Sequence, residues 1–180
     1  MVIITPAHEI TKALKILLET QMKTQEVVIS SAPLDLVPNQ SIKRVNLYLF
    51  KVEENTSLRN QTIPTSSQMV TQPPLPLNLN YLLTPFPDTN NYDEDYDLIV
   101  HEMLTDAMGV FYNYPVLTGS SEIPGSGIKL FSAELQEQIE LIKIIPSSLD
   151  TIRLMEIWKG IKMPYRLSVA YTVTATFKTI

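Results

Sequence analysis

The chain has 180 residues, no cysteine and a net charge of −5 at neutral pH. The length favours a single domain over residues 1–180, and the missing cysteines exclude disulfides, thiolate metal sites and cysteine nucleophiles. With 14 Lys and Arg residues the sequence predicts no basic stripe, so we expect neither nucleic-acid binding nor attachment to an anionic membrane. Charged residues make up 18% of the chain, against about 25% in typical soluble domains, and a surface short of charge often contacts another protein.

The first six residues lack the basic and apolar segments of a signal peptide. No stretch approaches the roughly 20 apolar residues that a membrane-spanning helix needs. We therefore expect a chain that is made in the cytoplasm and not exported by the general secretory route.

The N-terminal part of the sequence predicts one helix and two strands. Apolar residues three and four apart predict an amphipathic helix over residues 7–22. A β-branched run predicts a short strand over residues 26–30. Alternation over residues 45–51 predicts a second strand with aliphatic side chains on one side and aromatic ones on the other, so we expect both of its faces to be covered.

A polar segment without periodicity follows at residues 53–74. It joins two strands and exceeds the roughly 12 to 15 residues beyond which loops are usually functional or mobile. We expect an interaction loop that is ordered mainly by a partner, with its base more ordered than its tip. The residues at that base are Asn55, Leu58, Arg59 and Asn60.

The centre of the chain predicts a strand and a long helix that share one core. Apolar residues alternate over residues 75–83, and residues 84–88 read as a break. The period then changes to that of an amphipathic helix over residues 93–112. Its predicted inward residues are Tyr96, Ile99, Val100, Met103, Leu104, Ala107, Met108 and Phe111. These patterns predict an α+β fold, a mainly antiparallel mixed sheet with helices packed on one face.

After an irregular stretch at residues 113–132 the C-terminal part predicts a strand, a helix and a last strand. The strand over residues 137–145 is expected to place Ile139, Leu141, Lys143 and Ile145 on one face. The helix over residues 149–159 is expected to be capped by Ser147 or Ser148, with Asp150 in its first turn. Its expected inward residues are Leu149, Ile152, Met155 and Trp158. Strict alternation over residues 165–177 predicts a long, half-exposed strand with an open edge.

No pattern in the sequence predicts a catalytic, cofactor or metal site. His101 and Glu102 resemble the start of a zinc-protease helix, but Thr105 occupies the position of the second histidine ligand. His8 has no partner motif. The carboxylates of residues 93–97 resemble a calcium loop without its glycine and its final glutamate, and an acidic helix N-terminus explains them more simply.

The glycines predict local structure and no nucleotide site. The pair around Ser126 lacks the Lys and the preceding strand of a phosphate loop, so it reads as a flexible turn. Gly109 interrupts the long helix, where it costs about 1 kcal/mol relative to alanine. Two interpretations stay open for it: a close approach of another backbone, or a tolerated surface glycine.

Several segments, read together and in order, resemble one protein family. It is the N-terminal domain of the cap, or tail-terminator, protein of phage-tail-like contractile injection systems of the antifeeding-prophage and virulence-cassette type. The matching segments are RVNLYLFKVEEN at 44–55, SLRN at 57–60, PLPLNLNYLLT at 74–84, AM at 107–108 with YPVL at 114–117, Trp158, and PYRLSVAY at 164–171. The resemblance covers residues 10–175.

The resemblance implies a structural subunit without enzyme activity or cofactor, part of the assembled particle. It implies a homo-oligomeric ring, a hexamer, that ends the inner tube and joins it to the last ring of the sheath protein. Many relatives continue into a further C-terminal segment that grips the sheath, whereas this sequence ends at Ile180, so any sheath contact is expected from the domain itself. We expect it near the open edge of residues 165–177, including Tyr165 and Arg166, by addition of a strand.

Two other functions stay open. The same core could form a small-ligand or effector-binding adaptor domain, with its pocket between sheet and helices. An enzyme of unrecognised type is the third alternative, because two histidines do not exclude one.

Overall fold

The computed structural model describes residues 6–37, 41–59, 76–91 and 95–177. The strands are β1 (Val28–Ser30), β2 (Arg44–Glu54), β3 (Leu77–Phe86), β4 (Val116–Leu117), β5 (Ile139–Pro146) and β6 (Val169–Phe177). The helices are α1 (Pro6–Gln21), α2 (Thr56–Arg59), α3 (Tyr96–Asn113), α4 (Ala133–Gln138) and α5 (Thr151–Gly160), with the short 3-10 turns η1 (Leu34–Leu36) and η2 (Thr89–Asn91). No helix in these ranges is both long and apolar enough to cross a lipid bilayer.

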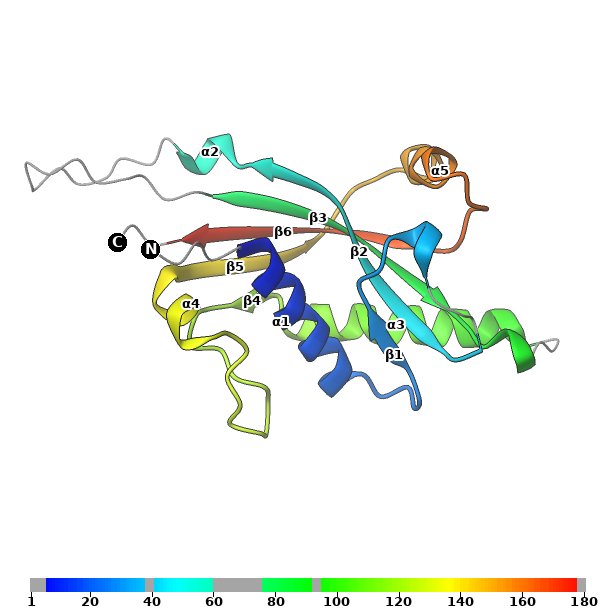
Figure 1. Ribbon diagram of the computed structural model, residues 1–180, viewed down its shortest axis with the longest axis horizontal. Helices are drawn as coiled ribbons and strands as arrows, with labels where there is room; N and C mark the ends of the chain where they lie inside the picture. Colours follow the sequence, from blue (N-terminus) through cyan, green and yellow to red (C-terminus); the bar gives the residue numbers. More distant parts are fainter. Residues whose placement is uncertain (1–5, 38–40, 60–75, 92–94, 178–180) are drawn as a thin grey trace, which may run out of the picture.

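All six strands belong to one sheet in the order β1-β2-β3-β6-β5-β4. Only β1 and β2 pair in parallel, and the other four pairings are antiparallel. Figure 1 shows α5 at the upper right, whereas α1 and α3 lie in the lower half of the molecule. α1 and α3 pack in the larger hydrophobic cluster, and α5 packs in the smaller one. The predicted fold class, α+β with a mainly antiparallel mixed sheet, is confirmed, and α5 adds a helix on the second face.

α3 packs on the sheet by one apolar side, as its spacing predicts. Its buried residues are Met103, Leu104, Ala107, Val110 and Phe111. The Phe111 ring meets the ring of Tyr171 on β6 edge to face, with the centroids 5.0 Å apart. Together with α1 the helix closes the larger of two hydrophobic clusters. The helix predicted over residues 93–112 is confirmed at Tyr96–Asn113.

One carboxylate fastens α3 to the segment that links α1 and β1. Asp106 Oδ2 accepts hydrogen bonds from the backbone N–H of Lys23 at 2.7 Å, the backbone N–H of Thr24 at 2.8 Å and the Thr24 hydroxyl at 2.8 Å. Hydrogen bonds to a charged acceptor are stronger than those between neutral groups. The turn after α1 is therefore held against α3, and β1 follows in the register that pairs Val28 with Arg44.

β3 contributes buried side chains to both faces of the sheet. Leu79, Tyr81 and Leu83 join the larger cluster, whereas Leu82 and Phe86 join the smaller one on the opposite face. The sequence placed a break at residues 84–88, but the strand continues to Phe86, and this prediction was wrong. Pairing with β6 ends at Leu83, so at Pro85 the strand has a neighbour only in β2. A proline is tolerated at such an edge position.

The smaller cluster lies between the sheet, η1 and α5. Trp158 of α5 and Leu34 of η1 are each 1% exposed and pack with Leu82 and Phe86. Tyr48 and Phe50 of β2 reach the same cluster, which confirms that both faces of β2 are covered. The helix stripe predicted with Ile152 and Met155 was wrong, because these residues are 70% and 49% exposed. The residues of α5 and its flanks that pack inward are Leu149, Leu154, Ile157, Trp158 and Ile161.

The cap of α5 also differs from the prediction. Asp150, and not Ser147 or Ser148, occupies the N-cap, and its side chain accepts a hydrogen bond from the Arg153 backbone N–H at 2.8 Å. An aspartate at this position satisfies one of the unpaired amides of the first turn.

A β-bulge inverts the predicted face of β5. Ile139 pairs with Phe177 and Leu141 pairs with Thr176, so Glu140 is the extra residue between them. A bulge moves the following side chains to the other face. The buried residues are accordingly Ile139, Ile142 and Ile144, and the predicted set that included Lys143 and Ile145 was wrong. The strand also begins later than predicted, because residues 133–138 form α4.

β6 lies inside the sheet, which corrects the predicted open edge at residues 165–177. The strand begins at Val169 and pairs with β3 on one side and β5 on the other. Tyr165 and Leu167 precede it and are 42% and 40% exposed. Because both edges of β6 are paired, another protein cannot add a strand to it.

Burial of a charge under α3 should unfold the domain. In a Leu104→Asp variant an unpaired carboxylate would replace a side chain that is 4% exposed, at an expected cost of about 3 to 5 kcal/mol. Thr105→Asp places the same group at the next, exposed position of the helix and serves as the control. Thermal melting followed by circular dichroism should show a cooperative transition only for the control. A cooperatively melting Leu104→Asp protein would contradict this packing.

Tyr81 should make the fold sensitive to alkaline pH. Its hydroxyl lies 2.8 Å from the Thr11 hydroxyl, and burial raises the pKa of Tyr81 to about 12. An unfolded tyrosine ionises near pH 10, so stability should be complete below about pH 10 and fall by about 1.4 kcal/mol per unit as the pH rises towards 12. Tyr81→Phe should weaken that pH dependence while it costs about 1 kcal/mol at neutral pH.

The measurement is denaturant unfolding between pH 8 and pH 11.5. Tyr112→Phe, at a side chain that is 84% exposed, is the matched control and should keep the dependence of the wild type. If the free energy of unfolding fell equally steeply with pH in the wild type and in Tyr81→Phe, Tyr81 would not be the cause of the loss of stability.

Candidate interaction surfaces

The structure separates the predicted interface residues into two groups at opposite ends of β3. Asn55 lies beside Asn78 near the start of β3, and Arg166 lies over the ring of Phe86 at its end. Asn78 and Phe86 are eight residue positions apart along the strand, a distance of about 26 Å. Asn60 lies outside the described residues, as do residues 60–75 of the predicted loop as a whole. Arg59 is the last residue of α2.

Asn55 anchors α2 to the end of the β2 and β3 ribbon. Its backbone N–H donates to the Pro76 carbonyl at 2.8 Å, and its side-chain amide donates to Asn78 Oδ1 at 3.1 Å. The Asn55 side-chain oxygen accepts from the Leu58 backbone N–H at 3.3 Å. The predicted base of the loop is therefore a hydrogen-bonded turn that begins a short helix.

A ladder of uncharged polar side chains crosses β2, β3 and β6 beside this turn. Asn78 Oδ1 also accepts from the Thr174 hydroxyl at 3.0 Å. Two residues further along β3, the Asn80 side chain accepts a hydrogen bond from the Thr172 hydroxyl at 2.9 Å and donates one to the Glu53 carboxylate at 3.1 Å. We call the residues Asn55, Asn78, Asn80, Thr172 and Thr174 the polar ladder.

The polar ladder lies on the face that α5 covers only in part. Its five side chains are half-buried, and Figure 1 shows α5 over one end of that face and α2 at the other. A shallow groove lined by Leu58, Glu140, Lys143 and Thr176 continues the surface onto β5. Neighbouring side chains hold each other in fixed orientations here, which suits recognition of another protein by hydrogen bonds.

Charged side chains border this surface on two strands, Lys51 and Glu53 on β2 and Glu140 and Lys143 on β5. Lys51 Nζ lies 2.7 Å from Glu53 Oε1, and both side chains are largely exposed. The hydrogen bond from Lys51 lowers the pKa of Glu53, and Asn80 contributes a second hydrogen bond. An exposed ion pair of this kind adds little stability. The predicted site residues did not include four members of the polar ladder, Asn78, Asn80, Thr172 and Thr174. Their alternation with apolar residues along the two strands had nevertheless indicated that they share one face of the sheet.

Arg166 and Tyr165 belong to a second surface at the N-terminal end of α3. The guanidinium carbon of Arg166 lies 5.0 Å from the centre of the Phe86 ring, a cation–π contact. The surrounding groove includes Tyr96, Asp97 and His101. Arg166 therefore contacts the smaller cluster through Phe86, whereas the side chain of its neighbour Tyr165 is exposed to solvent.

The two histidines do not belong to a metal-binding cluster in the described ranges. His8 and His101 are both exposed, and no group of three His, Asp or Glu residues in the described ranges could hold a metal ion. Asp93 and Glu94 of the calcium-like segment lie outside those ranges.

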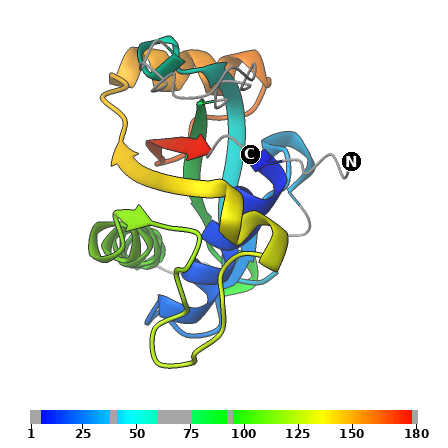
Figure 2. The same cartoon turned by 90° about the vertical axis from the view of Figure 1, so that its left-hand side faces the viewer.

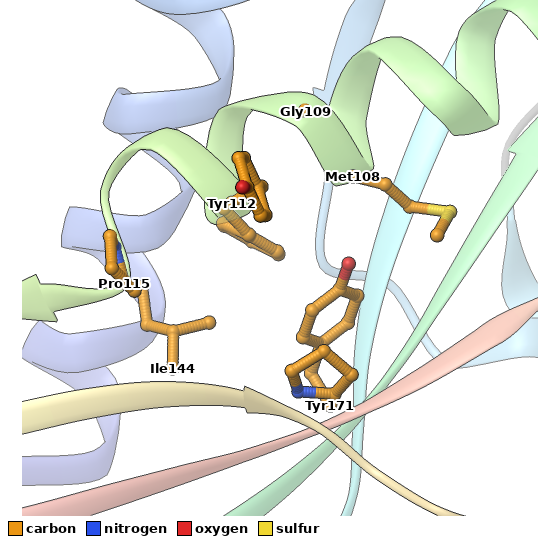
Figure 3. Close-up of a pocket in the computed structure, with 8 residues that line it drawn as sticks. Met108, Gly109, Tyr112, Pro115, Ile144 and Tyr171 are labelled. Atoms are coloured by element: carbon orange, nitrogen blue, oxygen red, sulfur yellow. The ribbon is translucent and has the colours of Figure 1, made fainter.

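An apolar pocket lies between α3 and the sheet. It has a volume of about 390 Å³ and is lined by Met108, Gly109, Phe111, Tyr112, Pro115, Ile144, Pro146 and Tyr171, which we call the α3 pocket. Figure 3 shows the Tyr171 ring standing on the sheet with its hydroxyl directed towards α3, and Tyr112 and Met108 on the helix above it. Burial raises the pKa of Tyr171, so it stays a neutral hydrogen-bonding group. The lining holds no Asp, Glu, Lys, Arg or His.

Gly109 keeps the α3 pocket open. A Cβ atom built on this residue would meet no other atom within 4 Å, so no backbone of the described chain comes close to it. Of the two interpretations left by the sequence, a close approach of another backbone is not seen among the described residues. A glycine inside a helix was the one sign of this pocket in the sequence. The remaining lining residues could not be predicted, because they come from separate elements.

The chain is similar to one protein family and to solved structures of contractile injection systems. The family model of the Pvc16 N-terminal domain matches residues 9–179. The fold resembles that of a PVC sheath/tube terminator in its extended state, from an extracellular contractile injection system. The TM-score is 0.61 at 16% identity, and the similarity covers 100% of this chain and 57% of that one.

The fold also resembles that of the anti-feeding prophage cap, a tube-terminating cap. Here the TM-score is 0.60 at 14% identity, with 95% of this chain and 54% of the other covered. The present chain thus spans little more than half the length of these two proteins. No curated protein matches the sequence.

Two glycines should respond in opposite ways to the same substitution. Gly109→Ala should stabilise the fold by about 1 kcal/mol, because alanine favours the helix and its methyl group meets no other atom within 4 Å. At Gly119 a Cβ would lie 1.9 Å from the Gln136 backbone oxygen, so Gly119→Ala should cost about 1 to 3 kcal/mol. Urea unfolding of both variants tests the pair. A destabilised Gly109→Ala protein would contradict the free space that the structure shows around this position.

Proposed function

Because the chain belongs to the Pvc16 N-terminal domain family, we propose that it is a structural cap, or tail-terminator, subunit of a contractile injection system. In this role it forms a homo-oligomeric ring, a hexamer, that ends the inner tube and connects it to the last ring of the sheath. It assembles in the cytoplasm and remains part of the finished particle. It acts without catalysis and without a cofactor.

The family match over residues 9–179 is the observation that carries the proposal. The fold is compatible with that of two terminator proteins along nearly the whole of this chain. The surfaces described above support the same role, since a ring subunit needs contacts to a neighbour and to the tube rather than a reaction centre. Contacts made by the remaining parts of those longer proteins are not assigned to this chain.

The polar ladder and the base of the loop are the proposed contact with the tube or sheath. Asn55 and Leu58 are fixed by hydrogen bonds, and Arg59 and Asn60 continue from them into residues 60–75. Tyr165 and Arg166 form a second proposed contact, because they lie at the other end of β3. This contact is made by side chains, since β6 has no free edge.

The α3 pocket supports a second candidate function, the binding of a small apolar ligand. Its volume of about 390 Å³ falls within the roughly 300 to 1,000 Å³ of known ligand pockets. Tyr112 and Tyr171 would supply the polar groups that orient a ligand. Native mass spectrometry of the purified protein tests this function, which predicts a retained small molecule that Gly109→Leu excludes.

Deletion of the gene in the producing cell tests the capping function. Electron microscopy should show tubes of uncontrolled length, or sheaths that contract or detach early. Complementation with the wild-type chain is the control and should restore particles of one length. Particles of normal length and full stability after deletion would contradict capping and would favour the ligand-binding function.

A further inference from the structure

Tyr171 stands on the sheet side of the α3 pocket with a hydroxyl that is unpaired in the described part of the chain. The residue is only 3% exposed. None of the described residues donates a hydrogen bond to this hydroxyl or accepts one from it. Buried polar groups are paired in the great majority of cases, so an unpaired one needs an explanation. Figure 3 shows that the hydroxyl is directed across the pocket towards α3.

The cross-strand neighbour of Tyr171 shows how such a hydroxyl is otherwise satisfied in this fold. Tyr81 on β3 pairs with Tyr171 in the register of the two strands, so both side chains lie on one face of the sheet. The Tyr81 hydroxyl lies 2.8 Å from the Thr11 hydroxyl of α1. On the other side of the α3 pocket the helix presents Met108 and Tyr112, with Gly109 between them. Tyr171 therefore lacks the counterpart that Thr11 provides for Tyr81.

The core holds the Tyr171 ring in this orientation. The ring of Phe111 meets it edge to face, with the centroids 5.0 Å apart, and both residues belong to the larger cluster. The phenol oxygen lies on the axis about which the ring turns, so rotation of the ring does not redirect it. The hydroxyl is thus a fixed polar group at the edge of an open space, and a Cβ atom at Gly109 would meet no other atom within 4 Å there.

Water and charged ligands are poor occupants of this space. An ordered buried water makes about three hydrogen bonds, whereas the lining of the α3 pocket is mostly apolar. The lining holds no Asp, Glu, Lys, Arg or His, so a carboxylate or an ammonium group would lose hydration without gaining a counter-ion. The occupant that fits is neutral and mostly apolar.

The lining also indicates the shape and size of the occupant. It presents the aromatic rings of Phe111, Tyr112 and Tyr171 and the thioether of Met108. Aromatic rings attract other rings edge to face or in offset stacks, and a thioether sulfur packs favourably against a ring edge. An apolar cavity of about 150 Å³ holds one benzene ring. The volume of the α3 pocket, about 390 Å³, is therefore sufficient for two fused rings.

We propose that the α3 pocket binds a neutral aromatic compound of about two rings that accepts a hydrogen bond from the Tyr171 hydroxyl. A phenol donates more readily than it accepts, because the ring withdraws electron density from its oxygen. The ligand lies between Tyr112 and the sheet, in the space that Gly109 leaves open. This inference rests on the second candidate function, ligand binding, and names the ligand class and the group that recognises it.

Naphthalene and quinoline test this class, because they have the same shape and differ by one hydrogen-bond acceptor. Quinoline has a nitrogen atom in place of one C–H group, and isoquinoline has it at the next ring position. The better of these two should bind the wild type about 3- to 10-fold more tightly than naphthalene, the contribution of one hydrogen bond. The anion 2-naphthoate should bind at least about 10-fold more weakly than naphthalene. Equilibrium dialysis at about pH 8 measures these affinities.

Two variants separate the hydroxyl from the space beside it. Tyr171→Phe should leave naphthalene binding unchanged and remove the advantage of the nitrogen compound. Gly109→Leu fills the pocket and should weaken the binding of every probe by about 10-fold or more. Tyr165→Phe is the matched control, because Tyr165 is 42% exposed and lies outside the pocket lining. Since Tyr171→Phe removes a hydroxyl without a partner in the described chain, this variant should melt no earlier than the wild type by circular dichroism.

The outcomes distinguish failure of the ligand class from failure of the function on which it rests. If the wild type or Tyr171→Phe binds naphthalene and the nitrogen compounds as in the other protein, the role of the hydroxyl is overturned and apolar ligand binding stands. If no probe binds the wild type up to its limit of solubility, the ligand class and the second candidate function both fail. Altered sedimentation velocity of Gly109→Leu without probe binding would assign the pocket to a protein contact instead. Capping is tested separately, by deletion of the gene.

Discussion

The burial of β3 on both of its faces is the constraint on which the rest of the structure depends. Five of its side chains are at most 2% exposed. Those of Leu79, Tyr81 and Leu83 are buried on one face of the sheet, and those of Leu82 and Phe86 are buried on the other. A strand of this kind requires a layer of structure above and below it. α3 with α1 supplies one layer, and α5 with η1 supplies the other.

The open surfaces follow from the unequal lengths of these covering elements. α5 has ten residues and is about 15 Å long, whereas the ten residues of β3 span about 33 Å. α5 therefore covers only one end of this face, and at the other end Asn78 and Asn80 replace apolar residues at the outward positions. Their hydrogen bonds with Thr172 and Thr174 satisfy the polar groups of the part of the face that lies beyond α5.

Local patterns predicted the elements whose environment is set by their own sequence. The helical spacing of Met103, Leu104, Ala107 and Phe111 identified α3. The interaction loop that follows Asn55 stays a prediction, because residues 60–75 lie outside the described residues. The errors have long-range causes. The place of β6 between β3 and β5 depends on pairing with distant residues, the bulge at Glu140 changes the period of β5, and the α3 pocket combines residues from three separate elements.

The scarcity of charge links the composition to the way these surfaces can bind. The polar ladder offers amide and hydroxyl groups, the α3 pocket offers apolar contact, and Lys51 and Glu53 at the rim already pair with each other. Contacts of these two kinds are only weakly screened by salt, unlike surface ion pairs. For the proposed capping function this property matters, because contacts of these kinds persist when the ionic strength changes.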